Sequence, residues 1–202
     1  DLALSREAAG GRALVAGDLT TTGVPLEPAG TMTYHELFEI YTEQITALAE
    51  AGADLLVVET MLGIDEMTVA LEAAQSVCAL PVLCSMTVQA DGSGYFGGTC
   101  VEAVETLQEL GAAAVGINCS TGPDQLESLV RNMKQAAKVP LLVKPNAGMP
   151  EISPEGEAIY SMGPAAFAQH MRTLIDAGAA LVGGCCGTDP RYISALRDVL
   201  PR

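Results

Sequence analysis

Residues 50–60 read EAGADLLVVET, and the same plan recurs in ELGAAAVGINC at residues 109–119 and in DAGAALVGGCC at residues 176–186. In each stretch a helical pattern ends at a glycine, the residue preferred just after the C-terminus of a helix. A short apolar run follows at once, which is typical of a strand buried on both faces of a parallel sheet. The three stretches therefore predict helix–turn–strand units that share one geometry.

Short apolar runs alternate with longer helical patterns along the whole chain. The expected strands cover residues 14–16, 55–58, 82–86, 114–117, 141–143 and 180–182. The expected helices cover residues 33–50, 65–79, 99–110, 124–137, 164–177 and 190–199, and residues 1–9 resemble the end of an earlier helix. The expected capping residues are Thr31 or Thr33, Asp65, Thr99 and Asp189. This alternation predicts an α/β fold with a parallel sheet and right-handed crossovers.

The chain has 202 residues and six strand–helix units, whereas a closed (β/α)8 barrel usually needs about 250 residues. The fold is therefore either a TIM-type (β/α)8 barrel that lacks its first two β/α units or an open six-stranded sheet. No linker divides residues 1–202, so a single domain is expected. The longest irregular segment, residues 146–163, directly follows a strand and is expected to overhang the same edge of the sheet as a lid.

Composition excludes several classes of function. The formal net charge of −15 argues against nucleic acid or an anionic membrane as a partner, because both require basic surfaces. No apolar run approaches the roughly 20 residues that span a bilayer, and the N-terminus lacks a signal-peptide pattern. The six cysteines are therefore expected to be reduced thiols, available for metal binding or catalysis in the cytoplasm.

The three repeated stretches bring polar residues to one level of the sheet. The seventh and eighth residues after the shared glycine are Glu59 and Thr60, Asn118 and Cys119, and Cys185 and Cys186. Equal spacing from equivalent turns places all of them at the C-terminal ends of strands. Active sites of parallel α/β proteins lie at that edge.

Cys119, Cys185 and Cys186 form the sharpest of these groups. Zinc prefers thiolates in a tetrahedral arrangement, and catalytic zinc sites use three protein ligands and leave one position open. Gly184 and Gly187 relax the backbone on either side of the cysteine pair. The alternative is that these are small buried cysteines that only fill space. The matched spacing favours a metal site.

The other three cysteines do not share the spacing from a glycine turn. Cys78, Cys84 and Cys100 are therefore expected to be packing residues. The glycines of residues 92–97 match the dinucleotide-binding pattern G-x-G-x-x-G. Three residues separate that pattern from the preceding strand, where a tight turn is needed, so a flexible loop is expected instead.

Two charged residues at strand ends have open alternatives. Lys144 is either a Schiff-base nucleophile, as desolvated lysines can be, or a lysine that reaches solvent or pairs with an acid. Glu59 either receives a substrate ammonium group or is paired structurally.

Four motifs together resemble the homocysteine S-methyltransferase family. They read ET at residues 59–60, NC at residues 118–119, PNAG at residues 145–148 and GGCCGT at residues 183–188. Residues 116–123, which read GINCSTGP, are most similar to the branch formed by the homocysteine-binding domains of cobalamin-dependent methionine synthases.

The resemblance implies a (β/α)8 barrel that methylates the thiol of homocysteine to give methionine. The zinc ligands and catalytic residues that it implies are Cys119, Cys185 and Cys186. The substrate-binding residues that it implies are Glu59, Ser85, Asn118 and Asn146. The implied methyl donor is methylcobalamin, held by another corrinoid-binding domain or protein.

Two motifs that open the family, at the ends of its first two strands, are absent from this sequence, and VAGD at residues 15–18 stands at the family's third strand. The expected domain is therefore a single, N-terminally incomplete barrel over residues 1–202. Its two open sheet edges favour self-association. Two alternatives are a Schiff-base aldolase or lyase that uses Lys144, and a fragment that binds zinc without catalysis.

Overall fold

The computed structural model describes residues 2–201 and contains a six-stranded sheet in the order β1-β2-β3-β4-β5-β8, in which every pairing is parallel. The strands are β1 (Ala16–Thr20), β2 (Leu55–Met61), β3 (Val82–Met86), β4 (Ala114–Cys119), β5 (Leu141–Pro145) and β8 (Ala179–Val182). The predicted α/β fold with six parallel units is confirmed.

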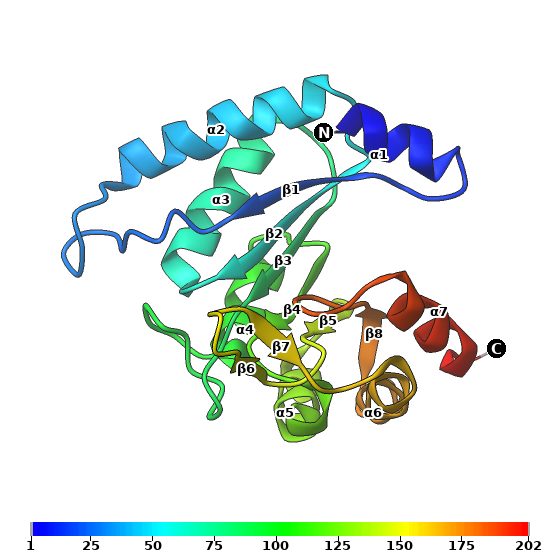
Figure 1. Cartoon of the computed structure of the whole chain (residues 1–202). Helices are drawn as coiled ribbons and strands as arrows, with labels where there is room; N and C mark the ends of the chain where they lie inside the picture. Colours follow the sequence, from blue (N-terminus) through cyan, green and yellow to red (C-terminus); the bar gives the residue numbers. More distant parts are fainter. Residues whose placement is uncertain (1, 202) are drawn as a thin grey trace.

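Helices line the outside of the curved sheet (Figure 1). They are α2 (Tyr34–Glu50), α3 (Ile64–Val77), α4 (Cys100–Glu109), α5 (Glu127–Ala136), α6 (Pro164–Asp176) and α7 (Pro190–Val199), with a 3-10 turn at η1 (Pro123–Gln125). The remaining helix, α1 (Leu2–Ala9), precedes β1 and buries no residue. The main core lies between the sheet and these helices: Leu19, Leu56 and Val58 of the strands are buried, as are Leu37 and Ile45 of α2. No described helix is both long and apolar enough to cross a membrane.

Side-chain caps begin three of the helices. Thr33 and Thr99 each form a capping box with the glutamate three residues later, and Asp189 caps α7 in front of Pro190. The prediction of Asp65 as a cap was wrong, because α3 begins after Gly63 and Asp65 lies in its first turn. An acidic residue there still favours the helix, since it faces the positive end of the helix dipole.

The first strand begins later than the apolar run predicted. Residues 14–16 were expected, but the paired residues run from Ala16 to Thr20. Leu14 lies outside the strand and is 75% exposed. The strand instead alternates, with Gly17 and Leu19 buried and Asp18 exposed. An edge strand with one open face carries this mixed pattern rather than a continuous apolar one.

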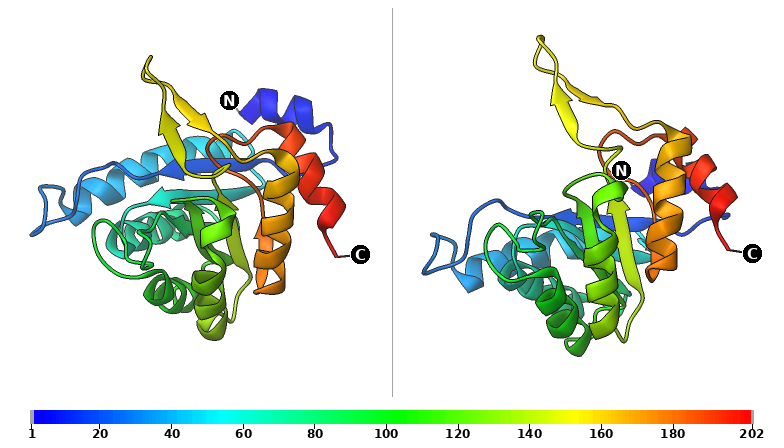
Figure 2. Two further views of the ribbon diagram at one scale, coloured as in Figure 1. Left: turned by 60° about the horizontal axis from the view of Figure 1, so that its bottom comes forward. Right: turned by 90° about the horizontal axis from the view of Figure 1, so that it is seen from below.

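The segment at residues 146–163 is partly regular. It contains a hairpin of two antiparallel strands, β6 (Pro150–Ile152) and β7 (Ala158–Tyr160), which the sequence did not predict. Both views in Figure 2 show the hairpin standing clear of the sheet. The helix expected at residues 124–137 is likewise divided, into η1 and α5.

On the concave face of the sheet, residues of the central strands are buried, whereas residues of the two outer strands are exposed. Paired residues of neighbouring strands point to the same face of a sheet. Gly116 pairs with Ser85 and with Leu142, so these three residues of the central strands all lie on the concave face. Ser85 is completely buried. Asp18 on β1 and Leu181 on β8 are exposed, and these two strands each have one partner in the described sheet.

Candidate metal centre

Three cysteine side chains converge at the C-terminal edge of the sheet. Cys119 ends β4, and Cys185 and Cys186 follow β8. Their Sγ atoms all lie within 4.8 Å of one another, and those of Cys119 and Cys186 are 3.8 Å apart. Within residues 2–201 this is the one group of at least three histidine, cysteine or acidic residues arranged closely enough to hold a metal ion. The sequence spacing had brought together the same three residues.

Local backbone geometry fixes this convergence. Cys119 has a φ of 58° and Ser120 a φ of 61°, in the left-handed region that residues other than glycine rarely adopt. Such strain is typical of functional sites, where the surrounding structure enforces it. The loops after β5 and β8 are also joined, since Cys185 N donates to the carbonyl of Pro145 at 2.9 Å and Ala147 N to that of Cys186 at 2.9 Å.

The distance between the Cys119 and Cys186 sulfurs fits zinc. Tetrahedral zinc–thiolate bonds of about 2.3 Å place neighbouring sulfurs about 3.8 Å apart, which matches the separation of Cys119 and Cys186. Cys119 and Cys185 are half-buried, whereas Cys186 is exposed. The three thiols therefore present a ligand set with an accessible side, as a site with one open coordination position requires.

The thiols also polarise one another. A hydrogen bond with Cys119, and a further one from Asn118, lower the pKa of Cys185 to about 5. The same hydrogen bond with Cys185, together with burial, raises the pKa of Cys119. Of these two thiols, Cys185 therefore ionises the more readily.

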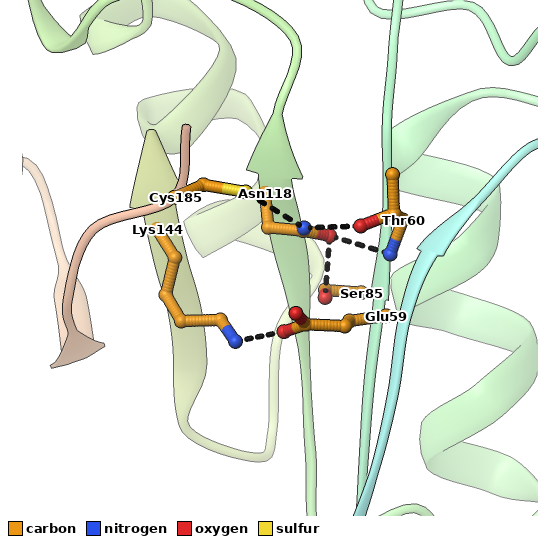
Figure 3. Close-up of polar contacts among 6 residues, drawn as sticks. All are labelled: Glu59, Thr60, Ser85, Asn118, Lys144 and Cys185. Carbon is orange, nitrogen blue, oxygen red and sulfur yellow. Dashed lines mark hydrogen bonds and ion pairs between the residues drawn. The ribbon is translucent and has the colours of Figure 1, made fainter. Parts of the chain in front are cut away.

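The Asn118 side chain is buried directly behind the cysteines and makes four hydrogen bonds (Figure 3). Its Oδ1 accepts from the backbone N–H of Thr60 and from Ser85 Oγ, both at 2.8 Å. Its Nδ2 donates to Thr60 Oγ1 at 2.7 Å and to Cys185 Sγ at 3.8 Å. The structure thus joins Asn118 and Ser85, two predicted substrate-binding residues, to each other.

Glu59 and Lys144 form an ion pair across the concave face, from β2 to β5 (Figure 3). Each side chain is about one-fifth exposed, at 20% and 23%. Nearby on β1, desolvation raises the pKa of Asp18, and the negative charge of Glu59 adds to the effect. The ammonium group of Lys144 is thus engaged by a carboxylate, which favours the paired alternative over a free Schiff-base nucleophile.

Asn146 supports the cysteine loop directly. It is 4% exposed, and its Oδ1 accepts a hydrogen bond from the backbone N–H of Cys186 at 3.1 Å. Asn146 also lines an open cavity of about 410 Å³ above the cysteines, together with Thr60, Cys119 and Cys186. The cavity gives a small molecule access to Cys119 and Cys186.

Tyr160 also lines this cavity, and sequence reasoning did not identify it. It ends β7 and packs so closely on Gly187 that a Cβ there would lie 2.3 Å from the tyrosine ring. Burial, and then the neighbouring Cys186, raise the pKa of Tyr160. No motif marks this tyrosine, because the hairpin fold alone brings it to the cysteines. The remaining cysteines lie elsewhere: Cys84 and Cys100 are buried in the core and Cys78 packs against it, as predicted.

The fold and the three strand-end cysteines define a barrel-type α/β protein with a candidate thiolate metal centre. The chain belongs to the homocysteine S-methyltransferase family, whose model matches residues 2–200. This confirms the family that the four sequence motifs indicated.

Individual relatives agree with this assignment. The chain is 30% identical to the methionine synthase of Mycobacterium leprae over 186 residues and 31% identical to that of Mycobacterium tuberculosis over 177 residues. These alignments cover 89% and 85% of this chain, but the chain spans only 15% of the length of either relative.

Solved structures show the same fold. The apo form of the homocysteine methyltransferase MmuM from Escherichia coli matches with a TM-score of 0.80 at 24% identity, over 98% of this chain and 71% of that one. Its metallated form matches with a TM-score of 0.78 at 23% identity, over 98% and 68%. The barrel-type architecture is therefore confirmed.

Proposed function

We propose that this chain is a zinc-dependent S-methyltransferase that acts on the thiol of homocysteine and yields methionine. The observation that carries the proposal is the convergence of Cys119, Cys185 and Cys186 within 4.8 Å in a chain of this family. The methionine synthases and the homocysteine methyltransferase to which the chain is similar support the choice of substrate.

Zinc would be held by the three cysteines. Their sulfur spacing supports this ion, and the relative from Escherichia coli has been solved in a metallated form. When bound, zinc would lower the pKa of a thiol that takes its fourth coordination position, so that the thiol would be a nucleophile near neutral pH. Three anionic cysteine ligands would keep electron density on that sulfur.

The residues around the cysteines would bind and orient the substrate. The open cavity admits the homocysteine side chain to the sulfurs, and Asn146 lines it. Glu59 would receive the ammonium group of the amino acid. Because Glu59 is paired with Lys144, it can do so only by sharing or exchanging that ion pair. A zwitterionic amino acid suits such an exchange, since it offers a carboxylate to Lys144 in return.

The methyl donor is proposed to be methylcobalamin, bound by another domain or protein. The chain corresponds to 15% of the length of the methionine synthases that it resembles, which leaves ample sequence in those proteins for a donor-binding domain. We further propose a cytoplasmic location, where thiols stay reduced. The open edges at β1 and β8 favour association with a further segment or a second copy.

The test is methionine formation from homocysteine and methylcobalamin by the zinc-loaded chain. We expect turnover to stop after chelation and in Cys186→Ser, and to persist in the control Cys78→Ser, which lies outside the site. Methionine formation that survives both chelation and Cys186→Ser would contradict the zinc-dependent mechanism. Stoichiometric zinc without turnover would mean a zinc-binding protein that does not catalyse methyl transfer.

A further inference from the structure

The Asn118 amide has no hydrogen-bonding capacity left for a substrate. A side-chain amide offers two acceptor positions and two donor hydrogens. Oδ1 accepts from Thr60 N and Ser85 Oγ, and Nδ2 donates to Thr60 Oγ1 and Cys185 Sγ. The side chain is 1% exposed, so a ligand in the cavity above the cysteines cannot reach it without displacing these partners.

The orientation of this amide is determined by its neighbours. The backbone N–H of Thr60 can only donate, so the group that faces it must be the oxygen Oδ1. The NH2 group is then directed toward Thr60 Oγ1 and the sulfur of Cys185, as Figure 3 shows. In the flipped orientation, two N–H groups would face each other. An N–H donor is therefore aimed at the cysteine sulfur by the structure itself.

The same amide stabilises a strained turn. Thr60 has a φ of 59°, and a β-branched residue in the left-handed region is a genuine outlier. Asn118 hydrogen-bonds both the N–H and the Oγ1 of Thr60 and so offsets this strain. Through one side chain on β4, the end of β2 is connected to the cysteine loop after β8.

We propose that Asn118 is a positioning residue of the metal centre, which holds the Cys185 sulfur by an N–H···S hydrogen bond and does not bind substrate. The inference rests on the proposed zinc site and extends it. Partners of this kind orient metal ligands, and their loss typically lowers metal affinity 10- to 100-fold. Thr60 and Ser85 keep the amide correctly oriented.

Three variants address the N–H···S bond to Cys185, the hydrogen bond from Ser85 and the turn at Thr60. Asn118→Asp keeps an acceptor for Thr60 N and Ser85 Oγ but removes the donor to Cys185. Ser85→Ala removes one partner of Oδ1 and leaves the N–H···S bond in place. Thr60→Gly relieves the strained turn, because glycine adopts a positive φ without strain, and it also removes the Oγ1 acceptor of the Asn118 amide.

The readouts are zinc affinity by chelator competition and the thiolate-to-metal charge-transfer band of the Co²⁺ form. Asn118→Asp is expected to weaken zinc binding about 10- to 100-fold and to shift the band. Ser85→Ala should change the affinity far less. The double variant Asn118→Asp/Thr60→Gly should stay as weak as Asn118→Asp, since relief of the turn does not restore the donor.

A measurement on the wild-type chain avoids any dependence on variant folding. In the ¹¹³Cd-loaded protein, a side-chain amide proton of Asn118 should show scalar coupling to cadmium through the hydrogen-bonded sulfur. Wild-type zinc affinity and an unchanged band in Asn118→Asp, recovery of affinity by Thr60→Gly, or absence of the coupling would each overturn the role of Asn118. Failure of the wild-type chain to bind metal would instead overturn the zinc site of the proposed function.

Discussion

The cysteine edge and the outer strands of the sheet differ in how completely the chain surrounds them. At the cysteine edge, side chains and loops from five strands interlock, and Ser85, Asn118 and Asn146 are buried with their hydrogen bonds made. On the concave face at the outer strands, Asp18 and Leu181 are exposed. The comparison teaches that the metal site depends on contacts within the described chain, whereas its surroundings are open to further contacts.

The largest effect should come from filling the closed centre of the sheet. A Cβ at Gly116 would lie 1.7 Å from the carbonyl oxygen of Leu142, so Gly116→Ala must move one strand. We expect a loss of about 3 kcal/mol or more in the free energy of unfolding, measured by urea titration. Gly163→Ala is the matched control, because nothing lies near its added methyl group. Equal free energies of unfolding for the two variants would contradict the claim that the centre of the sheet has no space for a side chain at Gly116.

Zinc removal should act on the cysteine edge alone. At a free zinc concentration of 100 times Kd, binding adds about 2.7 kcal/mol to the free energy of unfolding. Amide hydrogen exchange should show where this stabilisation lies. Protection should increase around Cys119 and Cys186 when zinc is added and should stay unchanged in β1. A uniform increase over the whole sheet would mean that the two regions are not independent.

The pH dependence of the metal-free chain should report the Cys185 thiolate. Its pKa is lowered from 9.0 to about 5, so the folded state favours the thiolate more than the unfolded state does. The resulting stability is complete above pH 9.0 and is lost as the pH falls through about 5. The difference in unfolding free energy between wild type and Cys185→Ser should therefore narrow toward pH 5. A difference that is constant with pH would contradict the claim that Cys185 is a thiolate in the folded, metal-free chain.

The smallest effect on stability is expected from a substitution on β1, an outer strand of the sheet. Asp18 lies on an edge strand and is exposed, but partial desolvation and the charge of Glu59 disfavour its carboxylate. Asp18→Asn should therefore leave the free energy of unfolding unchanged or raise it by no more than about 0.5 kcal/mol. Zinc affinity should be unaltered in the same variant. A tenfold change in that affinity would show that the edge strand participates in the metal site.

The same contrast explains what the sequence could predict. The centre of the sheet was predictable because its strands are nearly continuous apolar runs. The shared spacing from a glycine turn placed Cys119, Cys185 and Cys186 at the same level. The bounds of β1 were wrong because an edge strand need not be apolar throughout. The hairpin at Pro150–Tyr160 was missed because its short strands are mostly exposed and carry no apolar alternation.

Within the site, the missing information was tertiary. The spacing placed Asn118 beside Cys119, but it could not show that Thr60 and Ser85 occupy its oxygen. Nor could it show that Tyr160 and Cys186 line the same cavity, since strand β7 and the loop after β8 are far apart in the sequence. Residue types and register indicated which groups meet; only the packed structure shows which hydrogen-bonding positions remain free.

The central claim is that three cysteines of this chain hold one zinc ion. The most direct measurement is metal analysis of the purified chain beside Cys119→Ser, Cys185→Ser and Cys186→Ser, with Cys78→Ser as the matched control. We predict one equivalent of zinc in wild type and control and a clear deficit in each of the three variants. Retention of one equivalent by all three variants would contradict the account.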